Sequence, residues 1–500
     1  MTRHSTLLLA LLLAGSSALA PGCGPKRPPL EKDAQGRTIL VSEADAEPVE
    51  EQRRRRQDVL HTKDDDRRVG GEGARAVEAQ IGVLGDAALD EYVQALGDKL
   101  LRGVPRRFEY RFRVVDQVEP NAFALPGGHI FVSRGLLALA RSEDELANVI
   151  GHEISHVVRR HAATRQAIER HRTRFIMPWI RAGQDAAYSR DMERQADKEG
   201  QMLAAAAGYD PGALSTFLAS LGKAERLARG SARPPSMFDT HPGTTERVAS
   251  NAMRAAEIRW HRDPALGDTR SGYLERIEGL PYGDRPESGV FQGSRFLHPV
   301  LGFQMRFPEG WRTANSAGSV GAIAPDRQAQ VFLEPDKPWD DATAAAKRYV
   351  AELEKEIQSV KVLAFDPQTI AGHPGARLEL IVGGRIHALV AFFAYEGVHF
   401  RATGVTPARL MKGYRNRLLS AIRSFRPLAP GDARGIVSNR IRLVDARNGE
   451  NLAALCARSE CAPNTAPATA VMNGVGVRDH FGFGDIVKIV RAEPWTPPER

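Results

Sequence analysis

The sequence has little cysteine and no long apolar runs, and both absences limit what the protein can be. Three cysteines among 500 residues exclude a small fold held together mainly by disulfide bonds. Beyond the N-terminal segment no run of about 18 apolar residues occurs, so we expect no spanning helix in the mature chain. No motif recurs at a fixed period, which argues against a repeat array. We therefore expect two or three globular domains.

A strong charge imbalance is also missing. The formal net charge is +8 and 26% of the residues are charged, values that are ordinary for a globular protein. The densest basic run, Arg53–Arg56, lies between an acidic run and Asp64–Asp66. Because these charges nearly balance, a solvated linker explains the run better than a nucleic-acid surface, and we expect no nucleic-acid partner.

The N-terminus has the pattern of an export signal. Arg3 precedes the apolar run Leu7–Leu13, which is too short for a permanent membrane helix. The letters LAPGC, which end at Cys23, resemble a bacterial lipobox, although Ala20 and Pro21 depart from it. We expect a lipoprotein-type signal peptide over residues 1–23, with a lipid on Cys23 as the only membrane attachment. The expected location is the periplasm, anchored to the outer membrane; plain secretion is the alternative.

Composition and hydrophobic periodicity divide the rest of the chain into five segments. Residues 24–74 lack an apolar period and are expected to be a disordered linker, and the Gly- and Pro-rich residues 263–290 a second linker. Residues 75–262 predict a mainly helical domain with a small sheet, residues 291–430 a small α+β domain with one helix at Thr343–Ile357, and residues 436–492 a βααβ module. The expected fold class is α+β.

The letters HEISH, which begin at His152, fall in a predicted helix of the first domain. Ser142 and Glu145 form a capping box, so this helix is expected to begin at about residue 143. Residues four apart share one helix face, so His152 and His156 can bind one metal ion. Glu153 lies about 100° further round the helix, where it can reach a metal-held water and act as a general base. This spacing is what zinc-dependent hydrolysis needs.

A third ligand has to come from elsewhere in the chain. The longer pattern HExxHxxGxxH fails, because Arg159 and Ala162 replace its glycine and third histidine. His161 is about 140° round the helix from the second histidine, so we expect it to face elsewhere. A downstream helix offers Glu193, which would complete a site with an open position, and Asp197, which could orient a ligand histidine. Spacing alone leaves open that both carboxylates are solvated helix charges.

The segments ELANVIGHEISHVVRRHA and YSRDMERQADKEG together resemble peptidase family M48, the gluzincins that include HtpX-like proteases, and in particular its soluble BepA-like periplasmic members. The strand NAFALPGGHIFV and the segment THPGTTERV also match family signatures, and the resemblance covers residues 72–260. It implies a zincin-type metalloprotease domain that acts on proteins or peptides. It also implies one zinc ion per chain on His152, His156 and Glu193, with Glu153 as general base. The family's integral-membrane members have spanning helices that this chain lacks, so their prenylated substrates are not implied.

Three further features could contribute to such a site. An edge strand beside the metal could pair with an extended peptide, although Phe123 could equally pack in the core. His241 has three readings: a fourth ligand that silences the site, a hydrogen-bond donor to the oxyanion, or a loop residue without a role. Arg247 could support the same pocket or pair with an acid. The expected substrate strand comprises Asn121, Ala122, Phe123 and Ala124.

The C-terminal half offers no nucleophile–base pair, phosphate loop or metal cluster. Residues 295–428 vaguely resemble α+β domains of the PsbP and Mog type. The last unit resembles a LysM module, which implies binding of N-acetylglucosamine-containing glycans such as peptidoglycan, but its turn departs from the usual letters at Asn448–Asn451. The alternative is a module that only packs on its neighbour. Cys456 and Cys461 form an even pair outside the cytoplasm, which predicts a disulfide bond.

The sequence as a whole favours a zinc metalloendopeptidase of the cell envelope that degrades misfolded or misassembled envelope proteins; that task follows from the resemblance alone. Two other classes remain open. One is an envelope assembly factor or chaperone with little proteolysis, and the other is a cell-wall glycan-binding protein led by the LysM-like module.

Overall fold

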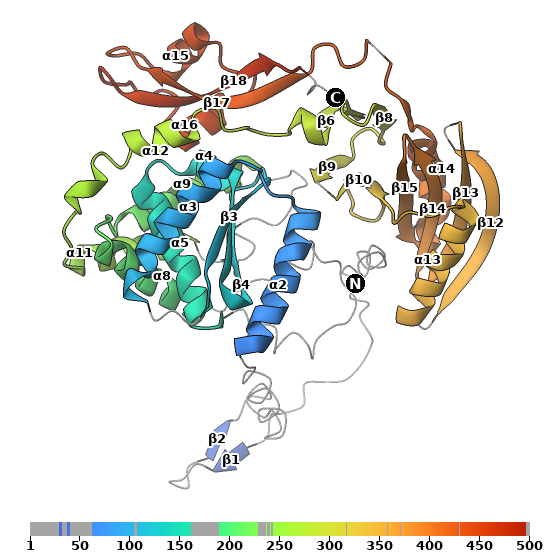
Figure 1. Ribbon diagram of the computed structural model, residues 1–500, viewed down its shortest axis with the longest axis horizontal. Coiled ribbons are helices and arrows are strands. Elements are labelled where there is room, and N and C mark those ends of the chain that lie inside the picture. Colours follow the sequence, from blue (N-terminus) through green and yellow to red (C-terminus); the bar gives the residue numbers. More distant parts are fainter. Residues whose placement is uncertain are drawn as a thin grey trace.

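The computed structural model describes residues 30–32, 38–40, 63–104, 108–161, 190–228, 237, 241, 244–316, 318–357, 359–370, 372–429 and 431–496. The expected signal peptide, the expected lipidation at Cys23 and most of the first expected linker lie outside the described residues. Three bodies are visible in Figure 1: a helical body in blue to green, a large sheet in yellow to brown, and a red module above the helical body. The short strands β1 (Leu30–Lys32) and β2 (Thr38–Leu40) pair with each other away from these bodies.

The helical body surrounds a three-stranded sheet. Its strand order is β3-β5-β4, with β3 parallel and β4 antiparallel to β5, so that β4 lies at an edge. Helix α2 begins at Lys63, so the prediction of a disordered linker up to residue 74 is wrong at its C-terminal end. The elements are α2 (Lys63–Gln80), α3 (Ala87–Leu100), β3 (Arg111–Val115), β4 (Ala122–Leu125), β5 (His129–Ser133), α4 (Arg134–Leu139), α5 (Glu143–Val158), α8 (Arg190–Ala206), α9 (Ala213–Ala228) and α11 (Thr244–Glu257).

The predicted start of α5 is confirmed. Ser142 is the N-cap, and its hydroxyl accepts a hydrogen bond from the backbone nitrogen of Glu145 at 3.3 Å. The reciprocal half of the capping box differs, because the Glu145 carboxylate accepts from the backbone and the guanidinium of Arg141 instead. The cap and the apolar face together fix where the helix that carries HEISH begins.

The segment 263–290 is not a bare linker, and that prediction is wrong. It contains helix α12 (Ser271–Ile277), whose Tyr273, Leu274 and Ile277 are fully buried in the core of the helical body. The Tyr273 hydroxyl donates to the backbone oxygen of Leu137 at 2.5 Å. Only a few apolar residues stand among many Gly, Pro and charged residues here, yet those few lie on one helix face and are buried together.

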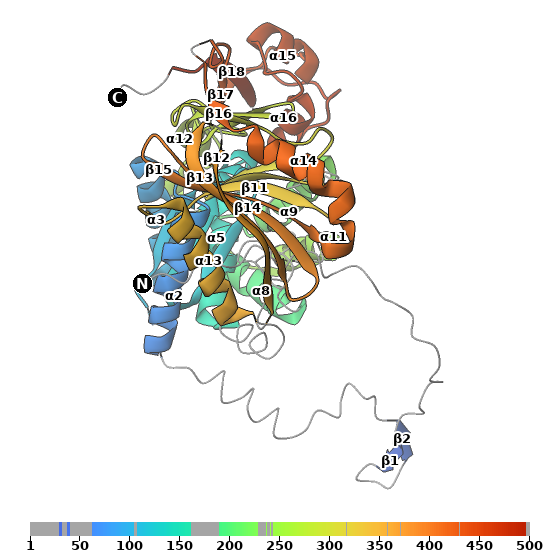
Figure 2. The ribbon, with the colours of Figure 1, turned by 90° about the vertical axis from the view of Figure 1, so that its right-hand side faces the viewer.

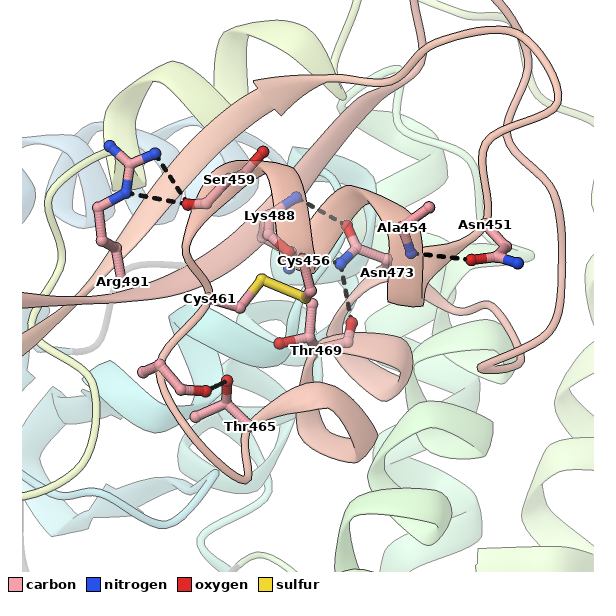
Figure 3. Close-up of a disulfide and its surroundings, with 11 residues drawn as sticks. Asn451, Ala454, Cys456, Ser459, Cys461, Thr465, Thr469, Asn473, Lys488 and Arg491 are labelled. Atoms are coloured by element: carbon pink, nitrogen blue, oxygen red, sulfur yellow. Dashed lines mark hydrogen bonds between the residues drawn. A yellow bond between two sulfur atoms is a disulfide. The ribbon is translucent and has the colours of Figure 1, made fainter.

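The C-terminal unit has the predicted βααβ order. Strand β17 (Val437–Asp445) pairs antiparallel with β18 (Ile486–Pro494), and α15 (Leu452–Ser459) and α16 (Ala466–Asn473) lie between them in sequence. A disulfide bond joins Cys456 in α15 to Cys461, which follows this helix (Figure 3). The Asn473 side chain ties the end of α16 to the backbone of Lys488 in β18, at 2.8 and 2.9 Å. The LysM identity of this unit stays a prediction.

This unit shares a core with the helical body. Ile441, Met472 and Val490 belong to the same buried cluster as the apolar residues of α5. The Lys488 ammonium is fully buried and donates to the backbone oxygens of Ala138 and Ala140, at 2.7 and 2.6 Å, just where α4 ends. Figures 1 and 2 both show the unit lying directly on this body.

The third body is the α+β domain. A seven-stranded sheet of order β12-β13-β14-β15-β11-β10-β9 and a four-stranded sheet of order β16-β8-β7-β6 form it. Helices α13 (Ala342–Glu356) and α14 (Met411–Arg423) pack into different buried clusters. The sequence predicted one helix and missed α14. The strands are β6 (Val290–Gln292), β7 (Arg295–His298), β8 (Phe303–Arg306), β9 (Arg312–Ser316), β10 (Ser319–Ile323), β11 (Gln330–Pro335), β12 (Val360–Ile370), β13 (His373–Val382), β14 (Ile386–Tyr395), β15 (Val398–Pro407) and β16 (Arg426–Pro427).

Candidate metal centre

Four side chains from three parts of the helical body converge at one buried point. His152 and His156 come from α5, Glu193 from α8, and His241 from the segment before α11. One ligand atom from each lies within 4.8 Å of the other three, and all four residues are buried. Two helices that lie far apart in sequence therefore place nitrogen and oxygen donors around a single point, as a metal site requires.

The spacing of these donors fits a tetrahedral ion. Ligands about 2.1 Å from zinc lie about 3.4 Å from one another at the corners of a tetrahedron. The Nε2 atoms of His152 and His156 are 3.0 Å apart, and His156 Nε2 is 3.4 Å from Glu193 Oε1. The distance from His152 Nε2 to the other carboxylate oxygen, Glu193 Oε2, is 3.8 Å. The residues present thus match a two-histidine, one-glutamate donor set in both chemistry and size.

Two glycines let the ligand-bearing helices approach closely. Gly151 on α5 faces Gly200 on α8, and a Cβ atom on Gly151 would lie 2.8 Å from the Gly200 backbone oxygen. A Cβ atom on Gly200 would lie 2.6 Å from the backbone nitrogen of His152. No side chain fits between the helices at this crossing, which is next to the first ligand. The short distance between α5 and α8 at this crossing brings Glu193 within reach of the histidines.

A buried acid and an arginine support His152 on the ring side that faces away from the donor cluster. His152 Nδ1 lies 3.0 Å from Asp197 Oδ1. Arg247 donates from Nε and Nη2 to both oxygens of Asp197, at 2.8 and 2.6 Å, and its Nη1 lies 2.7 Å from Glu193 Oε2. Asn251 also donates to Asp197, at 2.9 Å. The structure brings Asp197 to the outward nitrogen of a ligand histidine, where a carboxylate fixes the ring tautomer and orientation.

His241 takes the position of a fourth donor. Its Nδ1 is 2.8 Å from Glu193 Oε1 and 3.2 Å from His152 Nε2. Its backbone oxygen accepts from Arg247 Nη1 at 3.3 Å, and its backbone nitrogen donates to the oxygen of Met237 at 2.8 Å. These contacts hold the ring inside the cluster, so the reading of His241 as a residue without a role does not fit the geometry.

Glu153 lies at the same point without being one of the clustered donors. The carboxylate is fully buried, and neither oxygen has a hydrogen-bond partner among the described residues. Its Oε1 is 3.5 Å from His241 Nε2. Burial raises the pKa of Glu153, and the charges of His241 and His152 oppose that rise. An unsatisfied buried carboxylate beside a donor cluster is suited to take a proton from a water molecule held there.

The electrostatics of the cluster favour the metal-binding forms of Glu193 and His156. Burial alone would raise the pKa of Glu193, but His241, His156 and His152 together hold that pKa well below its usual value. Burial lowers the pKa of His156 well below its usual value. An ionised carboxylate and a neutral imidazole are the protonation states that coordinate a divalent cation.

His161 contacts the site, although its position on an ideal helix predicts that it faces elsewhere. Helix α5 ends at Val158, and Arg160 has a φ of 56°, so the chain turns back on itself. His161 Nδ1 then lies 3.0 Å from His156 Nδ1. Sequence analysis misses this residue because it extends the helix geometry past the last helical turn. The sequence around Arg160 contains no signal that predicts its left-handed backbone conformation.

The expected substrate strand lies beside the cluster. Strand β4 packs along α5, and a small cavity between them is lined by Ala124, Leu125 and His156. The Phe123 ring stacks on Phe131 at 5.3 Å, and that side chain is partly buried against a small apolar cluster. Among the described strands, β4 pairs on one side only, which leaves a backbone edge. The expected residues Asn121, Ala122, Phe123 and Ala124 all lie on or directly before this edge strand.

Two histidines on one helix and a glutamate from a second helix form the ligand set of catalytic His₂Glu zinc sites, the class of site found in metallopeptidases. Comparison with known families agrees with this class. Residues 87–183 and 172–254 match the model of peptidase family M48. The matched residues include all four clustered donors.

Several curated relatives match between 28% and 37% of the chain. The beta-barrel assembly-enhancing protease of Escherichia coli O157:H7 is 29% identical over 212 residues, which are 37% of this chain and 42% of that protein. The mitochondrial metalloendopeptidase OMA1 of Schizosaccharomyces pombe is 32% identical over 155 residues, 28% of this chain and 45% of that protein. The OMA1 protein of Arabidopsis thaliana is 38% identical over 174 residues, covering 31% and 34%. The chain thus spans less than half the length of these relatives.

Among solved structures, cyanobacterial PsbP from Synechocystis sp. PCC 6803 is similar over 29% of this chain and 98% of its own, with 17% identity and a TM-score of 0.24. The Ran-binding protein Mog1p of Saccharomyces cerevisiae covers 25% of this chain and 89% of its own, with 10% identity and a TM-score of 0.21. Similarity at this level assigns neither a fold nor a function.

None of the helices in the described part of the chain combines the length and the apolar character needed to cross a bilayer.

Proposed function

We propose that this protein is a zinc-dependent endopeptidase. The observation that supports this most directly is the convergence of His152, His156 and Glu193 at tetrahedral spacing, with the buried carboxylate of Glu153 beside them. A bound zinc ion would polarise the scissile carbonyl and lower the pKa of a water molecule towards neutrality. The match of residues 87–183 and 172–254 to the model of peptidase family M48 supports the same reaction class.

Within this reaction Glu153 is the general base. Its unpaired, buried oxygens accept the proton of the attacking water, and the raised pKa lets the same group return that proton to the leaving amine. Asp197 and Arg247 keep His152 and Glu193 in place, so the ligand atoms do not need to reorganise during the reaction. The edge of β4 holds an extended peptide by backbone pairing, which accepts varied sequences.

We further propose that His241 occupies the fourth ligand position in the resting protein. Its ring lies 2.8 Å from Glu193 Oε1 and 3.2 Å from His152 Nε2, as a fourth ligand would. In that state the position needed for water is filled, and the site is silent until a substrate displaces the ring. A donor to the oxyanion is the other role this place allows, and a variant at this position separates the two.

The proposed substrates are misfolded or misassembled proteins of the cell envelope, with the protein itself held there by a lipid on Cys23. One of the relatives carries the name beta-barrel assembly-enhancing protease, which supports a task of this kind. Peptidoglycan as a partner of residues 436–492 rests on the resemblance to LysM modules and is tested by cosedimentation of the full chain with peptidoglycan.

The experiment that tests the reaction is Glu153→Gln. This change keeps the size of the side chain and removes the base, so casein cleavage should fall by at least about a hundredfold while zinc content stays at the wild-type level. Glu246→Gln, at an exposed carboxylate on α11 that pairs with Arg194, is the matched control and should cleave normally. Full cleavage by Glu153→Gln would refute the mechanism. Rescue of an envelope defect by Glu153→Gln as well as by wild type would favour the assembly-factor class instead.

A further inference from the structure

The two ligand histidines are supported by different chemistry on their outward sides. His152 Nδ1 faces the carboxylate of Asp197. His156 Nδ1 faces another imidazole, that of His161, at 3.0 Å. A metal-bound histidine usually directs its outward N–H to a carboxylate, a backbone carbonyl or water. An imidazole in that place requires a defined tautomer of its own, because one ring nitrogen has to accept while the other donates.

The neighbours of His161 satisfy that requirement. With His156 Nε2 directed at the donor cluster, its Nδ1 carries the hydrogen and donates to His161 Nδ1. His161 then carries its hydrogen on Nε2. The side chain of Gln195 on α8 is a hydrogen-bond partner of His161, and the Gln195 amide nitrogen donates to Glu199 Oε1 at 3.2 Å, which leaves its oxygen to accept. His161 thus connects the helix of the histidine ligands with the helix of the glutamate ligand.

An ion pair between Arg160 and Asp66 holds the turn that places His161. Arg160 has a φ of 56°, a conformation that costs a non-glycine residue about 1–2 kcal/mol. Its guanidinium donates from Nε and Nη2 to the two oxygens of Asp66, at 2.8 and 3.0 Å. The Asp66 side chain is 5% exposed. A bidentate pair of this kind fixes the direction of the Arg160 side chain and so the path of the backbone into His161.

Asp66 belongs to α2, which packs closely against the turn between β4 and β5. A Cβ atom on Gly127, whose φ is 81°, would lie 2.8 Å from the Asp66 backbone oxygen, and a Cβ atom on Gly70 would overlap the oxygen of Pro126. Helix α2 therefore has a fixed position against the hairpin of the proposed substrate strand. It also precedes the segment that matches the family model, which begins at residue 87.

We propose that His161 is a positioning residue for the metal ligand His156, and that the Asp66–Arg160 pair makes α2 part of the metal centre. This inference rests on the proposed metal site. The pair holds the turn, the turn sets His161 against the outward nitrogen of His156, and the ring of His156 is thereby aimed at the ion. Helix α2 then contributes to metal affinity without contacting the metal.

The first test measures zinc affinity of the purified full chain by competition with a chromophoric chelator. His161→Ala should weaken zinc binding by about 10–100-fold, as loss of a ligand's hydrogen-bond partner does. His161→Asn keeps an acceptor oxygen near the position of Nδ1 and should restore affinity to within about threefold of wild type. Equal affinity of wild type and His161→Ala overturns the proposal, as does a failure of His161→Asn to bind better than His161→Ala.

The second test is a double-mutant cycle on the same readout. Asp66→Ala should weaken zinc binding in the wild-type background and have no further effect in the His161→Ala background, because both act through one path. The control is Asp64→Ala, on the same turn of α2, whose side chain is 87% exposed and pairs only with Arg67 among the described contacts; it should leave affinity unchanged.

An equal effect of Asp66→Ala in both backgrounds would show an independent, purely structural role and overturn the proposal. If Asp66→Ala does not fold, Asp66→Asn, which keeps the shape and removes the charge, takes its place with the same expectations. Wild-type protein that binds no zinc would refute the proposed metal site itself, whereas zinc binding that is insensitive to His161 and Asp66 would refute only this inference.

Discussion

Gly151 and Gly200 face each other where α5 crosses α8, so closely that a Cβ atom on either would meet backbone of the other helix within 3.0 Å. The first metal-ligating residue follows Gly151 directly, and Glu193 lies two helical turns before Gly200. The distance between the helices at this crossing therefore decides whether the third ligand can reach the histidines.

Gly200→Ala should separate the two helices and weaken the site. The added methyl would lie 2.6 Å from the His152 backbone nitrogen, and overpacking of this kind costs about 1–3 kcal/mol. We expect a lower free energy of unfolding in urea and weaker zinc binding. The control is Gly413→Ala, in the interior of α14, where a Cβ atom meets nothing within 4 Å. It should stabilise the protein by about 0.5–1 kcal/mol; similar destabilisation by both changes would argue against a special role of the crossing.

Arg247→Met should destabilise the protein strongly. Arg247 is the buried cation between Glu193 and Asp197, at 2.7 and 2.6 Å. Its loss leaves two buried carboxylates without the arginine cation that pairs with both, which costs about 3–5 kcal/mol. Calorimetry of the metal-free protein measures this as a fall in melting temperature. Arg194→Ala removes an exposed pair with Glu246 between the same two helices and should change stability by less than about 1 kcal/mol. An Arg247→Met protein as stable as wild type would contradict this account.

His241→Ala distinguishes the two roles left for this residue. If the ring is the resting fourth ligand, its removal opens the position for water, and casein cleavage should rise by several-fold at unchanged zinc content. If the ring instead stabilises the oxyanion, cleavage should fall by about 10²–10³-fold. We expect the rise, because His241 Nδ1 lies 2.8 Å from Glu193 Oε1, within the donor cluster. A fall would assign the oxyanion role.

Much of helix α5, which carries the two ligand histidines, can be predicted from sequence because its signals are local. The Ser142 cap and the apolar spacing fix the start of α5, and the helical period puts both histidines on one face. Glu193 cannot be placed from spacing, because its approach depends on the crossing of two helices about 40 residues apart in sequence. The resemblance to a family supplies it, and the geometry brings it to the histidines.

The errors have physical causes as well. Ideal helix rotation misplaces His161, because the helix ends at Val158 and Arg160 turns the chain back, held by an ion pair with distant Asp66. Residues 263–290 have the composition of a linker because Gly, Pro and charges dominate them, and composition does not show that Tyr273 and its neighbours share one buried face. Interactions between distant segments decide both cases.

Lys488 should make stability depend on pH. Burial, together with the charges of Arg270 and Arg141, lowers the pKa of Lys488 well below its usual value, while Glu145 opposes the shift. The unfolded chain therefore binds the proton more readily. Between the folded pKa and the unfolded value of about 10.4, stability rises with pH by up to about 1.4 kcal/mol per pH unit.

The measurement compares unfolding free energies of wild type and Lys488→Met between pH 6 and pH 10. The difference should shift in favour of wild type as the pH rises, because the thioether of the variant cannot titrate. Lys412→Met, at an exposed position in α14, should show a constant difference. A pH-independent difference for Lys488→Met would contradict a buried environment that favours the uncharged amine.

Zinc stoichiometry of wild type and Glu193→Ala tests the central claim most directly. After dialysis against a weak chelator, elemental analysis should find one zinc per wild-type chain and far less than one in Glu193→Ala, because the site then loses its carboxylate ligand. Glu246→Ala, at an exposed acid on α11, should keep the wild-type content. One tightly bound zinc in Glu193→Ala, or none in wild type, would contradict the account.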